Sequence, residues 1–158
     1  MPVRKIRVAL IEDSKTVRFF YKNLFEKAGF HVLEAENAKD GWNIIFDQKP
    51  DIIVLDMKMP EIPGIELLKR IRTFDFSKHI PVLVLTSVKD SEEVQEIFKQ
   101  GADHYCLKGM DSPNTIKETV NKLLKSEQEK RVIRSLNGQQ SEVENNSVSG
   151  IDREFFWF

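Results

Sequence analysis

The sequence predicts an α/β fold, a doubly wound sandwich in which five parallel strands form one sheet between two layers of helices. Two observations predict it. Short runs of aliphatic and β-branched residues alternate with amphipathic segments five times along the chain. The runs Ile52–Leu55 and Val82–Leu85 are apolar at every position, which is typical of parallel strands that are covered on both faces.

The first strand and the first helix follow from local signals. Ile6–Ile11 is predicted to be a strand, Ser14 to cap the helix that follows, and Gly29 to end it. This helix is expected to bury one stripe of side chains at helical spacing. The stripe consists of Val17, Phe20, Tyr21, Leu24 and Ala28.

The same alternation continues to the fifth strand. The later predicted strands are Val32–Ala35, Ile52–Leu55, Val82–Leu85 and Tyr105–Leu107. Apolar residues at helical spacing mark the helices between them. These residues are Ala38, Trp42, Ile45 and Phe46 in the second helix, Leu67, Leu68 and Ile71 in the third, and Val94, Ile97 and Phe98 in the fourth. Pro50 and Gly101 are expected to end the second and fourth helices.

A fifth helix is predicted to begin near Pro113, because proline suits the first turn of a helix. Its buried residues are expected to be Ile116, Val120, Leu123 and Leu124. Residues 4–125 are therefore expected to form one domain. The helix is predicted to continue through residues 126–136, where Val132, Ile133 and Leu136 form a separate apolar patch.

The last residues differ in composition from the domain. Residues 137–158 are predicted to be a flexible polar linker that ends in four successive aromatic residues, Phe155, Phe156, Trp157 and Phe158. Three interpretations of this aromatic cluster stay open: a docking motif for a target protein, the edge of a following domain, or a segment that folds back. Residues 126–158 are too few for a DNA-binding output domain, so either output through protein contacts or a chain that is part of a longer protein is expected.

Polar side chains are expected where four of the predicted strands end. They are Glu12 and Asp13 after the first strand, Asp56 after the third, Thr86 and Ser87 after the fourth, and Lys108 after the fifth. In doubly wound sheets, ligands bind in the crevice beyond the carboxyl ends of the strands. The sequence therefore predicts that these side chains converge at one edge of the sheet.

Three carboxylates in one crevice repel each other. At about 5 Å and an effective dielectric of about 20, each like-charge pair costs roughly 3 kcal/mol. A bound cation, Lys108 or a raised pKa of a carboxyl group offsets this cost, and all-oxygen ligands favour a hard ion such as Mg²⁺. Since a carboxylate can act as a nucleophile while cations hold phosphoryl oxygens, the cluster indicates phosphoryl chemistry.

These motifs, taken together, resemble those of the receiver domains of two-component response regulators. The matching motifs are Glu12-Asp13, the segment Asp56–Gly64 (DMKMPEIPG), Thr86-Ser87, and the segment Gly101–Lys108 (GADHYCLK). The resemblance covers roughly residues 4–125 and implies the flavodoxin-like (βα)5 fold. It implies a phosphorylation-dependent signalling switch that catalyses its own phosphorylation and slow dephosphorylation, rather than a conventional metabolic enzyme.

The resemblance assigns roles to the acidic residues. Asp56 is expected to accept a phosphoryl group from a sensor histidine kinase or a phosphotransfer protein. Asp13, Asp56 and the backbone carbonyl of Lys58 are expected to ligate Mg²⁺ or Mn²⁺. Glu12 is expected to act on the same ion mostly through water.

The resemblance also implies how the switch works. Thr86 is expected to hydrogen-bond the phosphoryl group, and Lys108 to pair with it. Tyr105 is the expected switch aromatic, which turns inward as Thr86 moves and remodels the face formed by the fourth helix, fifth strand and fifth helix. That face would control an unidentified protein target or association with a second copy of the chain.

Two residues depart from the family pattern. Gly109 follows Lys108 where the family usually has proline, often after a cis bond, so a trans bond and a different loop are expected here. Pro63 precedes the loop glycine where an acidic or amide residue is common, and a small effect is expected because proline suits a helix entrance.

Composition narrows the remaining alternatives. A net charge of −1, from 24 basic and 25 acidic residues, gives no strong electrostatic reason to bind nucleic acid or a membrane, and a cytoplasmic location is expected. Lys58, where a haloacid-dehalogenase phosphatase would have a second aspartate, argues against that enzyme class. A flavin-binding domain would not need the acidic pair together with Asp56 and Lys108. A degenerate receiver that acts as a phosphorylation-independent interaction module is the alternative that remains.

Overall fold

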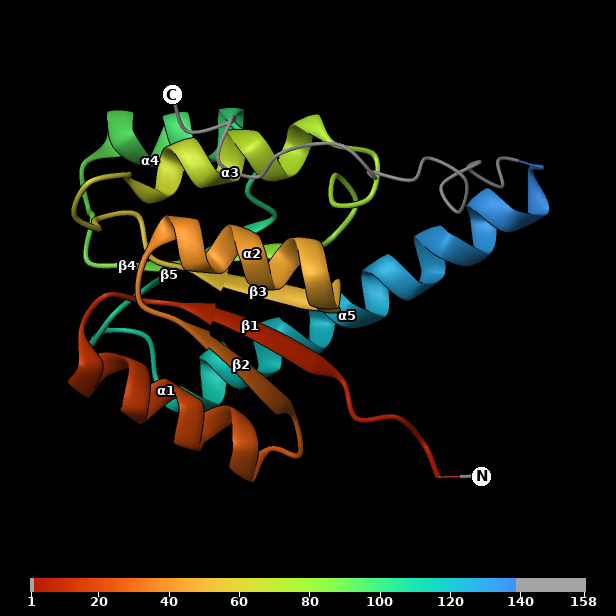
Figure 1. Cartoon of the computed structure of the whole chain (residues 1–158), viewed down its shortest axis with the longest axis horizontal. Coiled ribbons are helices and arrows are strands. Elements are labelled where there is room, and N and C mark those ends of the chain that lie inside the picture. The colour runs from red at the N-terminus through yellow and green to blue at the C-terminus, as the bar shows by residue number, and fades with distance from the viewer. Residues whose placement is uncertain (1, 139–158) are drawn as a thin grey trace.

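The structure is a computed structural model that describes residues 2–138, and it contains one sheet of five parallel strands in the order β2-β1-β3-β4-β5 (Figure 1). The strands are β1 (Arg7–Ile11), β2 (His31–Ala35), β3 (Ile52–Leu55), β4 (Val82–Thr86) and β5 (His104–Leu107). The helices are α1 (Lys15–Lys27), α2 (Ala38–Gln48), α3 (Gly64–Thr73), α4 (Ser91–Lys99) and α5 (Pro113–Leu136). The predicted alternation and fold class are confirmed.

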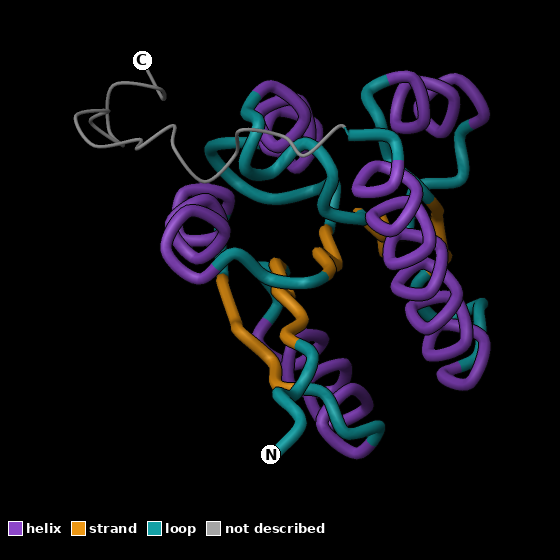
Figure 2. Tube along the Cα trace, turned by 90° about the vertical axis from the view of Figure 1, so that its right-hand side faces the viewer, coloured by secondary structure: helices purple, strands orange, loops and turns teal. Residues whose placement is uncertain are grey.

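Two separate cores form because successive side chains of a strand point to opposite faces of the sheet. In β1, Val8 and Leu10 pack against α1 and α5, whereas Ala9 and Ile11 pack against α2, α3 and α4. The other central strands, β3 and β4, alternate in the same way. Figures 1 and 2 show helices on both sides of the sheet. The sandwich therefore exposes the carboxyl ends of its strands at one edge.

Side chains at the helix starts explain where several helices begin. The Ser14 hydroxyl accepts a hydrogen bond from the Val17 N–H at the start of α1, as predicted. Asn37 caps α2, and Asp90 caps α4 by accepting from the Glu92 and Glu93 N–H groups. Each cap satisfies backbone donors that a helix leaves unpaired in its first turn.

The predicted stripe of α1 is wrong in part. Tyr21 and Phe25 are the buried residues of this helix, with Val17 and Leu24 half-buried beside them. Phe20 is 52% exposed and Ala28 is exposed, because the face toward the sheet centres on the Tyr21 and Phe25 turn.

α4 differs from its predicted stripe in one residue, whereas α2 buries its predicted tryptophan. In α4, the predicted core residue Phe98 is 46% exposed, whereas Ile97 is buried. Trp42 of α2 is 1% exposed and belongs to the core, as predicted. The spacing of apolar residues therefore locates a helix better than it orients the helix on the sheet.

α5 continues past the sheet, as the sequence predicts (Figure 1). At about 1.5 Å per residue its 24 residues extend about 36 Å. Val132, Ile133 and Leu136 near its end are exposed. The predicted aromatic cluster at residues 155–158 lies outside the described residues. Among residues 2–138, no helix combines the length and apolarity that a membrane span requires.

Candidate functional site

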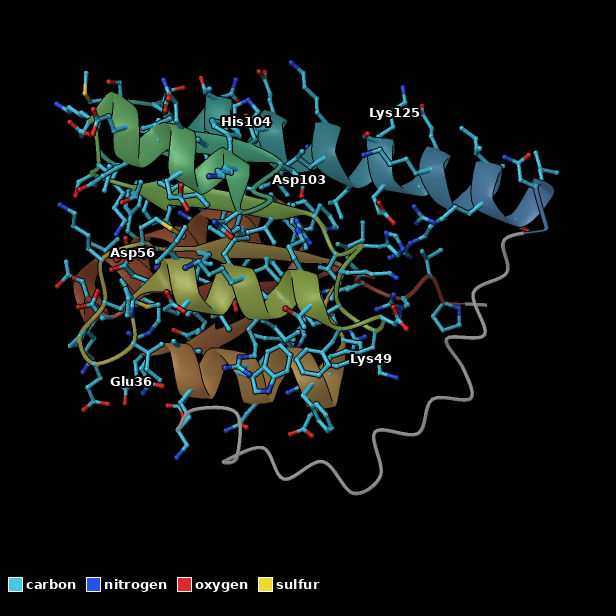
Figure 3. All side chains as sticks on the ribbon, turned by 90° about the horizontal axis from the view of Figure 1, so that it is seen from above. Glu36, Lys49, Asp56, Asp103, His104 and Lys125 are labelled. Carbon is cyan, nitrogen blue, oxygen red and sulfur yellow. The ribbon has the colours of Figure 1, made fainter. Side chains whose placement is uncertain are left out.

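The strand register brings the predicted site residues to one edge of the sheet. Ile11 pairs with Leu55, so Glu12 and Asp56 follow adjacent strands at the same level. The Asp56 N–H donates to the Ile11 carbonyl at 3.0 Å, which ties the two strand ends together. Figure 3 shows Asp56 at the end of the sheet opposite Lys49. This edge is where a doubly wound sheet binds its ligands.

Three carboxylates and one ammonium group meet there. Carboxylate oxygens of Glu12, Asp13 and Asp56 lie within 4.8 Å of one another. Asp56 is 5% exposed and Glu12 is 3% exposed, whereas Asp13 is open to solvent. The Lys108 ammonium lies 3.1 Å from the Asp56 Oδ2 atom and also forms an ion pair with Glu12. Three negative charges and one positive charge leave the cluster with a formal charge of −2.

Burial raises the pKa of two of these carboxyl groups. Desolvation raises the pKa of Asp56, and Lys108 opposes this by its charge and its hydrogen bond. Desolvation likewise raises the pKa of Glu12, where the nearby Asp56 charge adds to the rise and Lys108 again opposes it. The lysine thus offsets part, but not all, of the cost of placing the carboxylates together. A divalent cation would offset the remainder.

Two residues hold the acidic groups in place through the backbone. The Arg18 guanidinium, on α1, donates to the Glu12 carbonyl at 2.7 Å and to the Asp13 carbonyl at 3.4 Å. Gly64 begins α3 directly against the backbone of Asp56, since a Cβ there would lie 2.0 Å from the Asp56 carbonyl oxygen. Gly64 lies in the predicted motif Asp56–Gly64, but neither this contact nor the role of Arg18 is predicted from the sequence. A lone arginine in a helix gives no sign of such a role.

The loop after Asp56 bends back over its carboxylate. The Lys58 N–H donates to the Asp56 Oδ1 atom at 3.3 Å, and the Lys58 side chain is exposed. The Gly64 N–H donates to the Met57 carbonyl at 2.9 Å, which closes the loop against the start of α3. Pro63 is the N-cap of α3 and makes no side-chain cap hydrogen bond, in keeping with the expected helix entrance.

Thr86 and Tyr105 are connected through the backbone of one residue between them. The Val88 N–H donates to the buried Thr86 hydroxyl at 3.4 Å. The Tyr105 hydroxyl donates to the Val88 carbonyl. The hydrogen bond of Thr86 therefore runs to the loop that leads into α4 rather than to Asp56. Tyr105, on β5, is half-buried.

Lys108 leaves β5 on a turn without a cis peptide bond. The Lys108–Gly109 bond is trans, as predicted, and Gly109 adopts a φ of 73° that favours glycine. The Lys108 N–H donates to the Thr86 carbonyl at 2.9 Å, so the backbone of Lys108 continues the pairing of β4 with β5. This pairing directs the lysine toward the carboxylates that follow β1 and β3.

The sequences of curated relatives align with most of this chain. The sporulation initiation phosphotransferase F of Bacillus subtilis is 30% identical over 118 residues, which cover 75% of this chain and 93% of that protein. The chemotaxis protein CheY1 of Helicobacter pylori is 30% identical over 122 residues, which cover 75% of this chain and 97% of that protein.

Solved structures show the same fold. The receiver domain of the Francisella response regulator 1452 is 31% identical and has a TM-score of 0.70, with 77% of this chain and 98% of that chain covered. The chemotaxis protein CheY4 of Vibrio cholerae is 26% identical with a TM-score of 0.72, covering 76% of this chain and 99% of that chain. The sequence model of the response regulator receiver domain matches residues 8–121. With its acidic edge, its lysine and these relatives, the chain belongs to the response regulator receiver domains of two-component signalling.

Proposed function

We propose that Asp56 accepts a phosphoryl group from a histidine kinase, a phosphotransfer protein or a small phosphodonor. One observation carries this proposal: a buried carboxylate at the sheet edge lies beside a lysine and within 4.8 Å of two further carboxylates. In the reaction an Asp56 oxygen forms a bond to phosphorus while the bond from phosphorus to the donor atom breaks. The bonding pair leaves with the donor, an imidazole nitrogen or an acyl carboxylate.

The residues present fit a divalent cation. Glu12, Asp13 and Asp56 offer only oxygen atoms, the cluster has a formal charge of −2, and Lys108 alone does not offset its repulsion. Asp13, Asp56 and the Lys58 carbonyl would hold Mg²⁺ or Mn²⁺, and Glu12 would act mostly through water. A bound ion would supply positive charge where negative charge develops on the phosphoryl oxygens.

Lys108 would change its partner during the reaction. In the structure its ammonium group pairs with Glu12 and Asp56. When Asp56 becomes an acyl phosphate, its carboxylate charge moves onto the phosphoryl oxygens, and Lys108 would follow that charge. The lysine is 17% exposed, so little water competes for it.

The signal would leave the site through Thr86, Val88 and Tyr105. If the Thr86 hydroxyl turns to a phosphoryl oxygen, it releases the Val88 N–H. Because the Val88 carbonyl holds the Tyr105 hydroxyl, a shift of Val88 reaches β5 directly. The face formed by α4, β5 and α5 would then change its packing and control a protein target or a second copy of the chain.

Intact mass spectrometry after incubation with Mg²⁺ and acetyl phosphate tests the proposal. We expect one added phosphoryl group, absent without metal and absent in Asp56→Asn. Asp51→Asn is the matched control, since Asp51 is a half-buried aspartate at the opposite edge of the sheet. This variant should gain one phosphoryl group, as the natural chain does. If neither a phosphoryl adduct nor a beryllium fluoride complex forms, the chain is instead a phosphorylation-independent interaction module.

A further inference from the structure

Asp111 forms hydrogen bonds with the backbone of Leu107, the residue that precedes Lys108. Its Oδ2 atom accepts a hydrogen bond from the Leu107 N–H at 2.6 Å. Its own N–H donates to the Leu107 carbonyl at 3.0 Å, and the Met110 N–H reaches the same carbonyl at 3.3 Å. One residue thus holds both polar backbone groups of Leu107, the last residue of β5.

This restraint acts beside a turn whose own residue type leaves its backbone conformation open. Gly109 has a φ of 73°, and a Cβ on it would meet no atom within 4 Å. Glycine adopts many backbone conformations, so the turn after Lys108 is not held in one conformation by its own residue type. Gly109 and Met110 are both exposed. A restraint on Leu107 is therefore a restraint on the direction in which Lys108 leaves the sheet.

The Asp111 carboxylate is not needed to start α5. The N-cap of that helix is Ser112, whose hydroxyl accepts the Thr115 N–H at 3.1 Å. Asp111 lies one residue earlier, and its carboxylate accepts its hydrogen bond from Leu107 of β5. The two neighbouring residues therefore divide two tasks: Ser112 caps the helix, and Asp111 restrains the strand end that carries the lysine.

We propose that Asp111 is a positioning residue that holds Lys108 against Asp56 and Glu12 through its hydrogen bond to the Leu107 N–H. The inference rests on the proposed function of Lys108 as the partner of the phosphoryl group. The hydrogen bond, rather than the negative charge, carries the effect, because it fixes the backbone from which the lysine extends. An asparagine at 111 keeps an acceptor oxygen and should therefore keep the effect.

The first test does not depend on phosphorylation. Reductive methylation followed by peptide mapping measures how fast each lysine reacts, with the more exposed Lys69 as an internal reference. Asp111→Ala should make Lys108 react at least threefold faster, whereas Asp111→Asn should match the natural chain. Ser112→Ala weakens the start of the same helix without touching Leu107, and should leave Lys108 unchanged. Equal Lys108 reactivity in Asp111→Ala and the natural chain would overturn the proposal.

The second test measures the rate of phosphorylation by acetyl phosphate at saturating Mg²⁺. Small displacements of a positioned group change rates strongly, so Asp111→Ala should be about tenfold slower, with Asp111→Asn and Ser112→Ala close to the natural chain. Mg²⁺ affinity, measured by calorimetry, should not weaken in Asp111→Ala, because Lys108 is not a metal ligand. A weakened Mg²⁺ affinity, or the same loss in Ser112→Ala, would contradict a positioning role. If the natural chain accepts no phosphoryl group, the proposed function fails, and the methylation test still decides whether Asp111 holds Lys108.

Discussion

Gly64 shows how much of the site depends on one missing atom. A Cβ at this position would lie 2.0 Å from the Asp56 carbonyl oxygen and 2.8 Å from the Met57 Cα atom, both of which are backbone atoms. Backbone cannot move aside as a flexible side chain can. Any other residue at 64 must therefore push α3 away from the loop that follows Asp56 or displace Asp56 itself.

We expect Gly64→Ala to lower the free energy of unfolding by about 2 kcal/mol, in the range of overpacked cores, and to slow phosphorylation. Urea denaturation and the acetyl phosphate assay measure the two effects. Gly41→Ala is the control, because its nearest contact is the end of the Ile11 side chain at 2.7 Å. A Gly64→Ala variant no less stable than Gly41→Ala would contradict the close approach.

The sequence predicts the site residues better than it predicts what holds them. Asp56 and Lys108 could be placed because a strand end is a local feature and parallel strand ends share one edge. Arg18 and Asp111 could not, since their contacts depend on how α1 and the loop before α5 sit on the sheet. The exposed Phe20 has the same cause, because spacing along a helix does not set its rotation against a neighbour.

At the scale of elements, β4, β5 and the start of α4 meet at Val88. Tyr105→Phe removes the hydroxyl group that donates to the Val88 carbonyl and leaves the aromatic ring in place. A neutral hydrogen bond of this kind contributes about 1 kcal/mol, so the fold should tolerate its loss. Phosphorylation of Asp56 should proceed at a similar rate, because Tyr105 does not contact the carboxylates in the structure.

Hydrogen exchange of residues 87–90, with and without beryllium fluoride, measures this connection. In the natural chain, binding should change the exchange of both this loop and β5. In Tyr105→Phe the change in β5 should fall by at least half. Asp56→Asn, which should not form the complex, gives the baseline. An unchanged response of β5 in Tyr105→Phe would show that the signal does not pass through the Val88 carbonyl.

The far end of α5 carries a separate cluster of charged side chains. Glu127 is 8% exposed, and Arg131 and Arg134, one and two turns later, both pair with it. Glu127→Gln removes the counter-ion of two arginines that water still reaches, so it should lower the free energy of unfolding by about 1 kcal/mol. The loss should shrink at high salt. Glu129→Gln, an exposed neighbour on the same helix, should cost close to nothing by denaturation.

At the scale of the whole molecule, the acidic edge sets how stability responds to pH and to metal. Desolvation raises the pKa of Asp56 and of Glu12 from their ordinary values. In the window between the ordinary and the raised pKa values, the folded chain binds more protons than the unfolded chain. The contribution of these groups to the stability of the metal-free protein therefore falls as pH rises through that window.

A bound divalent cation reverses this dependence of stability on pH, because it interacts with the ionised carboxylates only. Mg²⁺ should raise the melting temperature at pH 8, and the increment should shrink once the pH falls into the range where protons compete for Asp56 and Glu12. Thermal unfolding with and without metal measures the increment. At a metal concentration tenfold above the dissociation constant, binding should stabilise the folded chain by about 1.4 kcal/mol. Asp56→Asn should be more stable than the natural chain without metal, since it removes one of three like charges, and its Mg²⁺ increment should be small throughout. An increment that does not fall when the pH drops below the titration midpoints of Asp56 and Glu12, followed in the same samples, would mean that the buried carboxylates do not bind the ion.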